Sequence, residues 1–149
     1  MQRVAQAQQV SVQAGDIVLL RTGWLAWYDG LDEAGREALR GTLHPGEGGM
    51  ACPGLDATQE TAAWLWDHQI AAMASDNVAL EALPVDAKTG GFQHRRLIAL
   101  QGMPIGEVWD LEELARDCVQ DGVYEFFLVS VPLNLPGGVG SPANAYAIK

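Results

Sequence analysis

The two side chains in this sequence best suited to chemistry are His94 and Glu107, which stand thirteen residues apart. His94 begins a stretch with helical character, whereas Glu107 lies in an extended stretch after Gly102-Met103-Pro104. A histidine on a helix and a carboxylate on the following strand can converge on one metal ion, and this pair of ligand types suits zinc or manganese. The same pair is more often a hydrogen-bonded structural contact, so the spacing alone leaves both interpretations open.

Other polar and aromatic residues are weaker candidates for a functional site. Asp76 follows a buried apolar run, where α/β proteins often place functional groups, but a carboxylate there can equally cap the turn at Asn77 and Val78. Trp24 and Trp27 flank a loop and could line a pocket. Of the three histidines, the two besides His94 are most simply surface or helix-capping residues.

Composition excludes several classes of function. Nine Lys and Arg stand against nineteen Asp and Glu, a formal net charge of −10, so the clustered cations of a nucleic-acid-binding surface are not expected. No apolar run approaches the ~20 residues of a membrane helix, and the first residues lack the apolar core of a signal peptide. The two cysteines have no C-x-x-C spacing, and we expect a reducing, cytoplasmic location. The glycine-rich stretch 137–142 lacks the lysine and helix of a phosphate-binding loop.

A single α/β domain is expected to position these residues, because predicted strands and helices alternate along the chain. Asp110 is predicted to cap a helix through the amide of Glu113. The long apolar run 124–133 predicts a central strand that is covered on both faces. Helices are predicted over residues 2–9, 32–40, 94–100 and 111–120 and after Leu55 with Asp56 or Thr58 as cap, and strands over 17–20, 71–74, 124–133 and 145–148.

An ordered series of short motifs resembles the metal-dependent cyclase family, which includes bacterial kynurenine formamidase, isatin hydrolase and polyketide cyclases. The resemblance covers nearly the whole chain and implies a swivelling β/β/α fold that assembles as a homodimer or larger oligomer. It also implies that Glu107 is a metal ligand and that His94 is a second ligand or a proton relay. The motifs are GDIVLLRTGW at 15–24, PGL at 53–55, ASDN at 74–77, HRRLI at 94–98, GMPIGE at 102–107, PL at 132–133 and GSPA at 140–143.

The chain departs from the family pattern at one signature. Family members carry an earlier H-x-G-T-H-x-D-x-P-x-H string, which supplies most of the metal ligands and the residue proposed as general base, and no such string occurs here. The chain therefore resembles the C-terminal half of the family domain, with the N-terminal part of the fold absent. Two ligands do not fill a catalytic zinc site, which takes three from protein plus a water.

The resemblance implies a hydrolase that cleaves the C–N bond of a small amide or lactam, as an arylformamidase does in tryptophan and kynurenine catabolism. In the complete site, zinc or manganese would polarise the carbonyl and deliver hydroxide. The alternative is a catalytically incomplete module that pairs with itself or with a separate chain carrying the N-terminal half. Neither interpretation involves a nucleic acid or a membrane. The candidates for shaping a substrate pocket are Arg21, Thr22, Trp24, Gly138 and Ser141.

Overall fold

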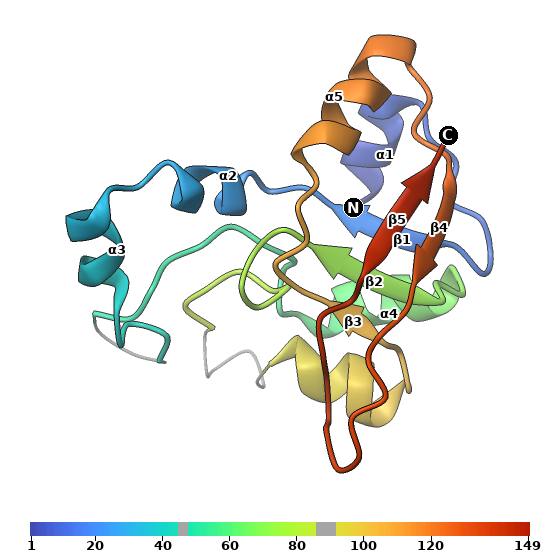
Figure 1. Ribbon diagram of the computed structural model, residues 1–149. Helices are drawn as coiled ribbons and strands as arrows, with labels where there is room; N and C mark the ends of the chain where they lie inside the picture. Colours follow the sequence, from blue (N-terminus) through green and yellow to red (C-terminus); the bar gives the residue numbers. More distant parts are fainter. Residues whose placement is uncertain (45–47, 86–91) are drawn as a thin grey trace. The chain divides into compact units, whose positions relative to one another are not determined.

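The computed structural model describes residues 1–44, 48–85 and 92–149, which divide into two compact units (Figure 1). The larger unit is Ser11–Glu112, and the smaller unit combines Met1–Val10 with Glu113–Lys149. A parallel sheet and both of the leading candidates for chemistry, His94 and Glu107, belong to the larger unit. The mixture of helices and strands confirms the predicted α/β class.

The larger unit is built on three parallel strands in the order β1-β2-β3 (Figure 1). These are β1 (Ile17–Leu20), β2 (Ala72–Ser75) and β3 (Ile105–Gly106), so the strands predicted over 17–20 and 71–74 are confirmed within one residue. β2 lies in the middle, and three of its four residues are buried. Because the strands are parallel, the residues that follow each of them emerge at one edge of the sheet.

Three helices connect β1 to β2: α2 (Trp24–Asp29), α3 (Glu33–Leu39) and α4 (Gln59–Asp67). Asp32 caps α3 by accepting from the Gly35 amide at 2.8 Å, and Thr58 caps α4 by accepting from the Thr61 amide at 3.3 Å. Both predicted helices are therefore confirmed, with Thr58 rather than Asp56 as the cap. None of the helices in the described residues has the length and apolar character needed to cross a lipid bilayer.

A π-helix, η2 (Arg95–Leu100), connects β2 to β3, where an ordinary helix beginning at His94 was expected. Leu97 is fully buried, whereas Ile98 is 48% exposed and does not face the core. A π-helix closes its hydrogen bonds over five residues instead of four, so fewer of its residues share one face. The residue spacing of an ordinary α-helix therefore does not apply to this turn.

The smaller unit contains α1 (Gln2–Gln8), α5 (Glu112–Asp121, from Glu113 onward) and an antiparallel ribbon of β4 (Phe127–Ser130) and β5 (Ala145–Ile148). The helix predicted over 2–9 and the strand over 145–148 are confirmed. Lys149 joins the ribbon to α5, because its Nζ lies 2.9 Å from carboxylate oxygens of both Asp117 and Asp121.

Two predictions about the last part of the chain are wrong. The run 124–133 forms a four-residue strand whose only ladder among the described residues is with β5, and Phe127 is 67% exposed, so it is not a covered central strand. An apolar run shows that a strand needs cover but not that the chain supplies it. Asp110 accepts from the Glu112 amide at 3.2 Å and not from the Glu113 amide. This contact is a local turn at the start of the helix, so the predicted capping box does not form.

Candidate functional site

His94 lies between two carboxylates in the larger unit. Its Nδ1 is 2.8 Å from Oε2 of Glu81, and its Nε2 is 3.1 Å from Oε1 of Glu107. The Glu81 side chain is 0% exposed, whereas those of His94 and Glu107 are 36% and 31% exposed. The structure thus brings His94 and Glu107 together as the spacing predicted, and it adds a buried third member.

The two carboxylates favour the charged form of the imidazole. Glu107 makes the larger contribution and Glu81 the second, and together they raise the pKa of His94 from 6.5 to about 10 against the opposing effect of burial. The contact of His94 with Glu107 is an ion pair without hydrogen-bond alignment, since Glu107 Oε1 has no hydrogen-bond donor among the described residues. Near neutral pH the ring therefore carries a proton on each nitrogen.

Glu81 is held by backbone pairing with the segment that contains the PGL motif. The Leu55 amide donates to Leu80 O and the Ala82 amide donates to Leu55 O, both at 2.8 Å. Gly54 is required for this close approach, because a Cβ there would lie 2.6 Å from the Ala82 nitrogen. Asn77 connects the same two segments, since its Nδ2 donates at 2.7 Å to the carbonyl of Pro53.

His94 is positioned by the anchored π-helix that it precedes. The fully buried Gln93 donates through Nε2 to the carbonyls of Asp56 at 2.9 Å and Thr58 at 3.0 Å. At the other end of the helix, Gln101 Nε2 donates to Ala62 O at 3.0 Å. Both ends of η2 are thereby fixed to the start of α4, which restricts where the His94 ring can lie.

Glu107 is positioned by β3, where Gly106 pairs with Ala74 of β2. A Cβ at Gly106 would lie 2.7 Å from the Ala74 side chain and from the Trp109 indole, so only glycine permits this approach. Val108 then bonds back through its amide to Asn77 O at 2.9 Å, with a φ of 56°. A left-handed conformation is rare for a β-branched residue, and such strain is typical of functional sites.

Thr22 and Arg21, two of the predicted pocket residues, have partners within the protein. Asp76 Oδ1 accepts from both the amide and the hydroxyl of Thr22 at 2.7 Å, and its Oδ2 accepts from the Gly23 amide at 2.6 Å. Asp76 therefore supports the loop after β1 and does not cap its own turn at Asn77 and Val78. Arg21 forms a two-pronged ion pair with Glu112, at 2.7 and 2.9 Å.

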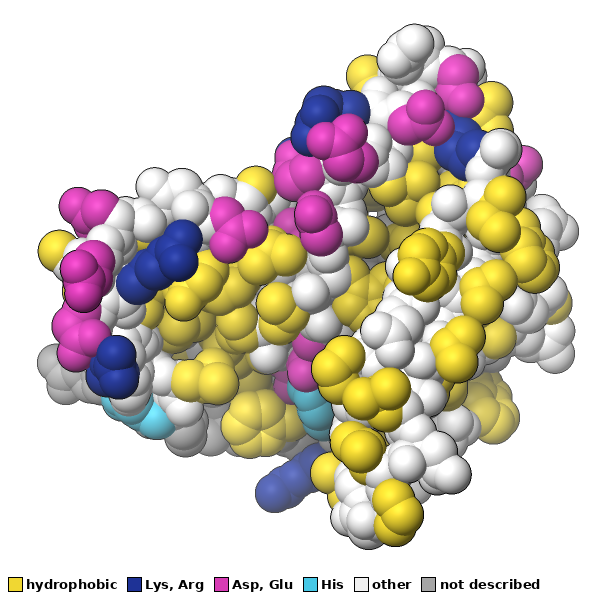
Figure 2. Space-filling model, in the orientation of Figure 1, with side chains coloured by type: hydrophobic (Ala, Val, Ile, Leu, Met, Phe, Trp, Pro, Cys, Tyr) yellow, Lys and Arg dark blue, Asp and Glu magenta, His cyan; other side chains and the backbone are white. Residues whose placement is uncertain are grey.

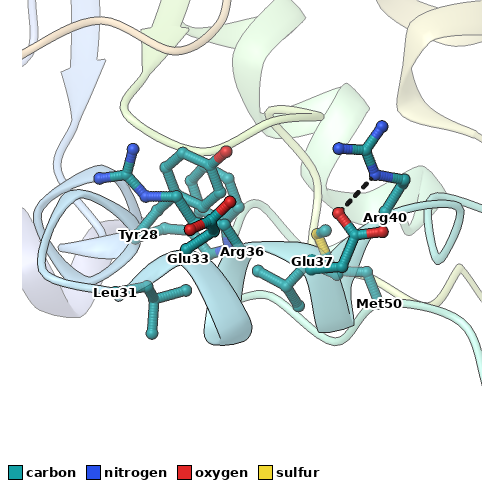
Figure 3. Close-up of a pocket in the computed structure, with 9 residues that line it drawn as sticks. Tyr28, Leu31, Glu33, Arg36, Glu37, Arg40 and Met50 are labelled. Atoms are coloured by element: carbon teal, nitrogen blue, oxygen red, sulfur yellow. Dashed lines mark hydrogen bonds and ion pairs between the residues drawn. The ribbon is translucent and has the colours of Figure 1, made fainter.

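Trp24 lines an open hollow of about 660 Å³ on the larger unit (Figure 3). Its ring stacks on Tyr28 with centroids 5.3 Å apart, and its buried Nε1 has no hydrogen-bond partner among the described residues. Trp27 is half exposed and does not line the hollow. His94, Glu81 and Glu107 do not line it either. The lining residues are Trp24, Tyr28, Leu31, Glu33, Arg36, Glu37, Leu39, Arg40 and Met50.

Gly138 and Ser141 belong to the smaller unit, in the loop between β4 and β5. The Gly138 amide donates to Leu135 O at 2.9 Å, and the Ser141 hydroxyl accepts from the Leu133 amide at 2.8 Å. The loop is thus ordered by contacts within itself. Its predicted part in shaping a pocket stays a prediction.

The donor set of the site falls short of a catalytic metal centre. Glu81 and Glu107 each have a buried Oε1 without a hydrogen-bond donor among the described residues, and such an atom can accept from a further donor or a cation. However, both nitrogens of His94 already face carboxylates, and the described ranges contain no group of three His, Cys, Asp or Glu side chains that could hold a metal. A catalytic zinc ion takes three protein ligands, so these residues alone do not fit one.

Comparison with known proteins identifies the family of this chain. The Cyclase family model matches residues 1–82. The crystal structure of a protein described as a novel cyclase is 39% identical and superposes with a TM-score of 0.77, covering 99% of this chain and 45% of its own. No curated protein matches the chain. The chain thus spans just under half the length of that solved relative, and it belongs to the cyclase family.

Proposed function

We propose that this chain forms part of a hydrolase that cleaves the C–N bond of an amide or lactam, with aryl formamides as the model substrates. The observation that carries the proposal is the imidazole of His94 held between Glu81 and Glu107. Cleavage of a C–N bond releases an amine, whose nitrogen must gain a proton as the bond breaks. The partly exposed His94 can supply that proton from Nε2, which leaves the ring neutral.

The metal that the resemblance implies requires ligands beyond those described here. We assign them to polypeptide outside these 149 residues, which would complete a swivelling β/β/α fold of which this chain is the C-terminal portion. The 45% coverage of the solved relative supports this assignment, because that protein contains more than as much chain again. In the assembled enzyme, Glu107 would hold the metal, His94 would lie beside it as the proton carrier, and Arg21 and Thr22, which follow β1, would border the substrate.

The proposal is tested by supplying the missing polypeptide. The part of the 39%-identical relative that this chain does not cover is fused to it, and bound zinc or manganese and the hydrolysis of an aryl formamide and a lactam are measured. Hydrolysis is expected to fall at least a hundredfold in His94→Gln and Glu107→Gln, in line with the loss of a general acid. Glu113→Gln, which changes an exposed carboxylate on α5, is the matched control and should keep full activity. A folded, metal-loaded fusion without hydrolysis would overturn the proposal.

A second candidate is a catalytically incomplete module that docks onto another polypeptide through the β4–β5 ribbon. The strand register places Phe127, Val129, Tyr146 and Ile148 on one face, and all but Val129 are more than half exposed. Figure 2 shows hydrophobic side chains gathered over this ribbon. An apolar sheet face of this kind is typical of an interaction surface. We assign it to the polypeptide that the longer relative carries and this chain does not.

A further inference from the structure

Glu81 is a buried carboxylate whose neighbours in the sequence are apolar. It stands alone in the apolar run VALEALP at 78–84, and its side chain is completely buried. A buried carboxylate is costly unless it is paired and hydrogen-bonded. Among the described residues, the only hydrogen-bond partner of its side chain is His94 Nδ1, at 2.8 Å, while its second oxygen has none.

The backbone that carries Glu81 is fixed on both sides. Cys52 and Leu83 exchange both of their backbone hydrogen bonds, at 3.1 and 2.9 Å, directly beside the pairing of Leu55 with Leu80 and Ala82. The Asn77 side chain also donates to the Glu81 carbonyl at 3.3 Å. With its backbone pinned and its side chain enclosed, Glu81 has little freedom to leave the imidazole.

Glu107 contacts the opposite nitrogen of the same ring, but it is less buried and less well aligned than Glu81. Its side chain is about one third exposed, and its contact with Nε2 is an ion pair without hydrogen-bond alignment. The ring therefore has one rigid partner, at Nδ1, and one adaptable partner, at Nε2. A fixed hydrogen bond on one ring nitrogen determines which nitrogen is left for chemistry.

We infer that Glu81 is a positioning residue for His94: it accepts the Nδ1–H and so directs Nε2 toward Glu107. The inference rests on the proposed function only in treating His94 as a residue of the active site. Glu81 itself does not contact the substrate, because its side chain is completely buried.

The test is NMR of the whole chain labelled with ¹⁵N-histidine, which needs neither metal nor substrate. With three histidines in the sequence, His94→Gln identifies the signals of His94. We expect a slowly exchanging Nδ1–H resonance in the wild type. It should move in Glu81→Gln, which keeps an acceptor but loses the charge, and disappear in Glu81→Met, which keeps the volume without an acceptor. Glu107→Gln, which changes the partner of the other ring nitrogen, should leave this resonance present and slowly exchanging, and Glu113→Gln on α5 is the matched control that should leave it unchanged.

Each outcome decides the matter. A resonance that is absent in the wild type, unchanged in Glu81→Gln, or dependent on Glu107 instead would overturn the inference. If Glu81→Met fails to fold by circular dichroism, the contrast between Glu81→Gln and Glu107→Gln still gives the answer. Because no turnover is measured, failure here leaves the hydrolase proposal standing, and failure of the fusion to hydrolyse amides leaves the role of Glu81 standing.

Discussion

At the scale of single residues, the site is an imidazole with a carboxylate at each ring nitrogen. Each carboxylate stabilises a positive ring, and the pKa of His94 rises to about 10 in consequence, with Glu107 the first cause and Glu81 the second. An imidazolium suits proton donation, whereas a metal ligand must be a neutral imidazole. In this chain both ring nitrogens of His94 are engaged by carboxylates, which leaves the choice between the two roles to the polypeptide that would complete the site.

The raised pKa of His94 predicts how stability depends on pH. Because the folded value of about 10 lies above the ordinary 6.5, the contribution is fully present below pH 6.5 and is lost as pH rises toward 10. For one proton the slope is at most ~1.4 kcal/mol per pH unit, and solvent screening of this one-third-exposed ring reduces it. We expect the free energy of unfolding, measured in urea, to fall between pH 6.5 and 9.0 in the wild type.

His94→Gln should flatten that pH dependence, and His68→Gln, which removes a histidine at the end of α4, should not. The pH interval of the measurement ends at 9.0 because of Cys52. Burial raises the pKa of its thiol above the ordinary 9.0, so Cys52 lowers the free energy of unfolding only above pH 9.0. A wild-type protein whose stability is constant across the interval would show that His94 is not charged between the two carboxylates.

At the scale of elements, loops after neighbouring parallel strands supply the site. β2 leads into Asn77 and then Glu81, and β3 leads into Glu107, while the π-helix brings His94 across. This arrangement follows the rule that ligands of open α/β sheets bind beyond the carboxyl ends of the strands. Its precision depends on places where two backbones touch without an intervening side chain.

Gly54→Ala tests the closest of these contacts. The added Cβ would lie 2.6 Å from the backbone nitrogen of Ala82, and backbone on both sides cannot yield as a flexible side chain does. We expect a loss of about 1–3 kcal/mol in the free energy of unfolding, typical of overpacking, together with a displaced Nδ1–H resonance of His94. Gly140→Ala, which meets open space, should change neither quantity. Equal effects of the two substitutions in urea titration would refute the argument.

Local signals explain which elements the sequence can predict. Helix α3 is marked by Asp32 at its cap, and β5 is a short apolar segment after a glycine-rich turn, so each is encoded within its own residues. Glu81 is absent from the predicted site because its role depends on segments brought together from positions 52–55 and 94. One signal does point to it: a single carboxylate within an apolar run is the pattern of a buried acid with a partner.

At the scale of the whole molecule, three observations on this member of the cyclase family belong together. It covers 45% of the solved relative, its described residues lack a three-ligand metal group, and its β4–β5 ribbon exposes an apolar face. A two-stranded ribbon is at best marginally stable in water without cover. The proposal that further polypeptide completes the site would account for all three observations.

The apolar face of the β4–β5 ribbon allows this proposal to be tested by measuring how tightly the chain binds the proposed polypeptide. The double variant Phe127→Ser/Tyr146→Ser removes the two large aromatic side chains from the face, each about two-thirds exposed. Its affinity for the separately produced uncovered part of the relative should be at least tenfold weaker in sedimentation velocity, since buried aromatic anchors dominate most interfaces. Val119→Ser, an equally exposed apolar residue on α5, should bind as the wild type does. Equal affinity in all three proteins would remove the ribbon as the docking surface, and wild-type self-association that the double variant abolishes would identify a second copy of this chain as its occupant.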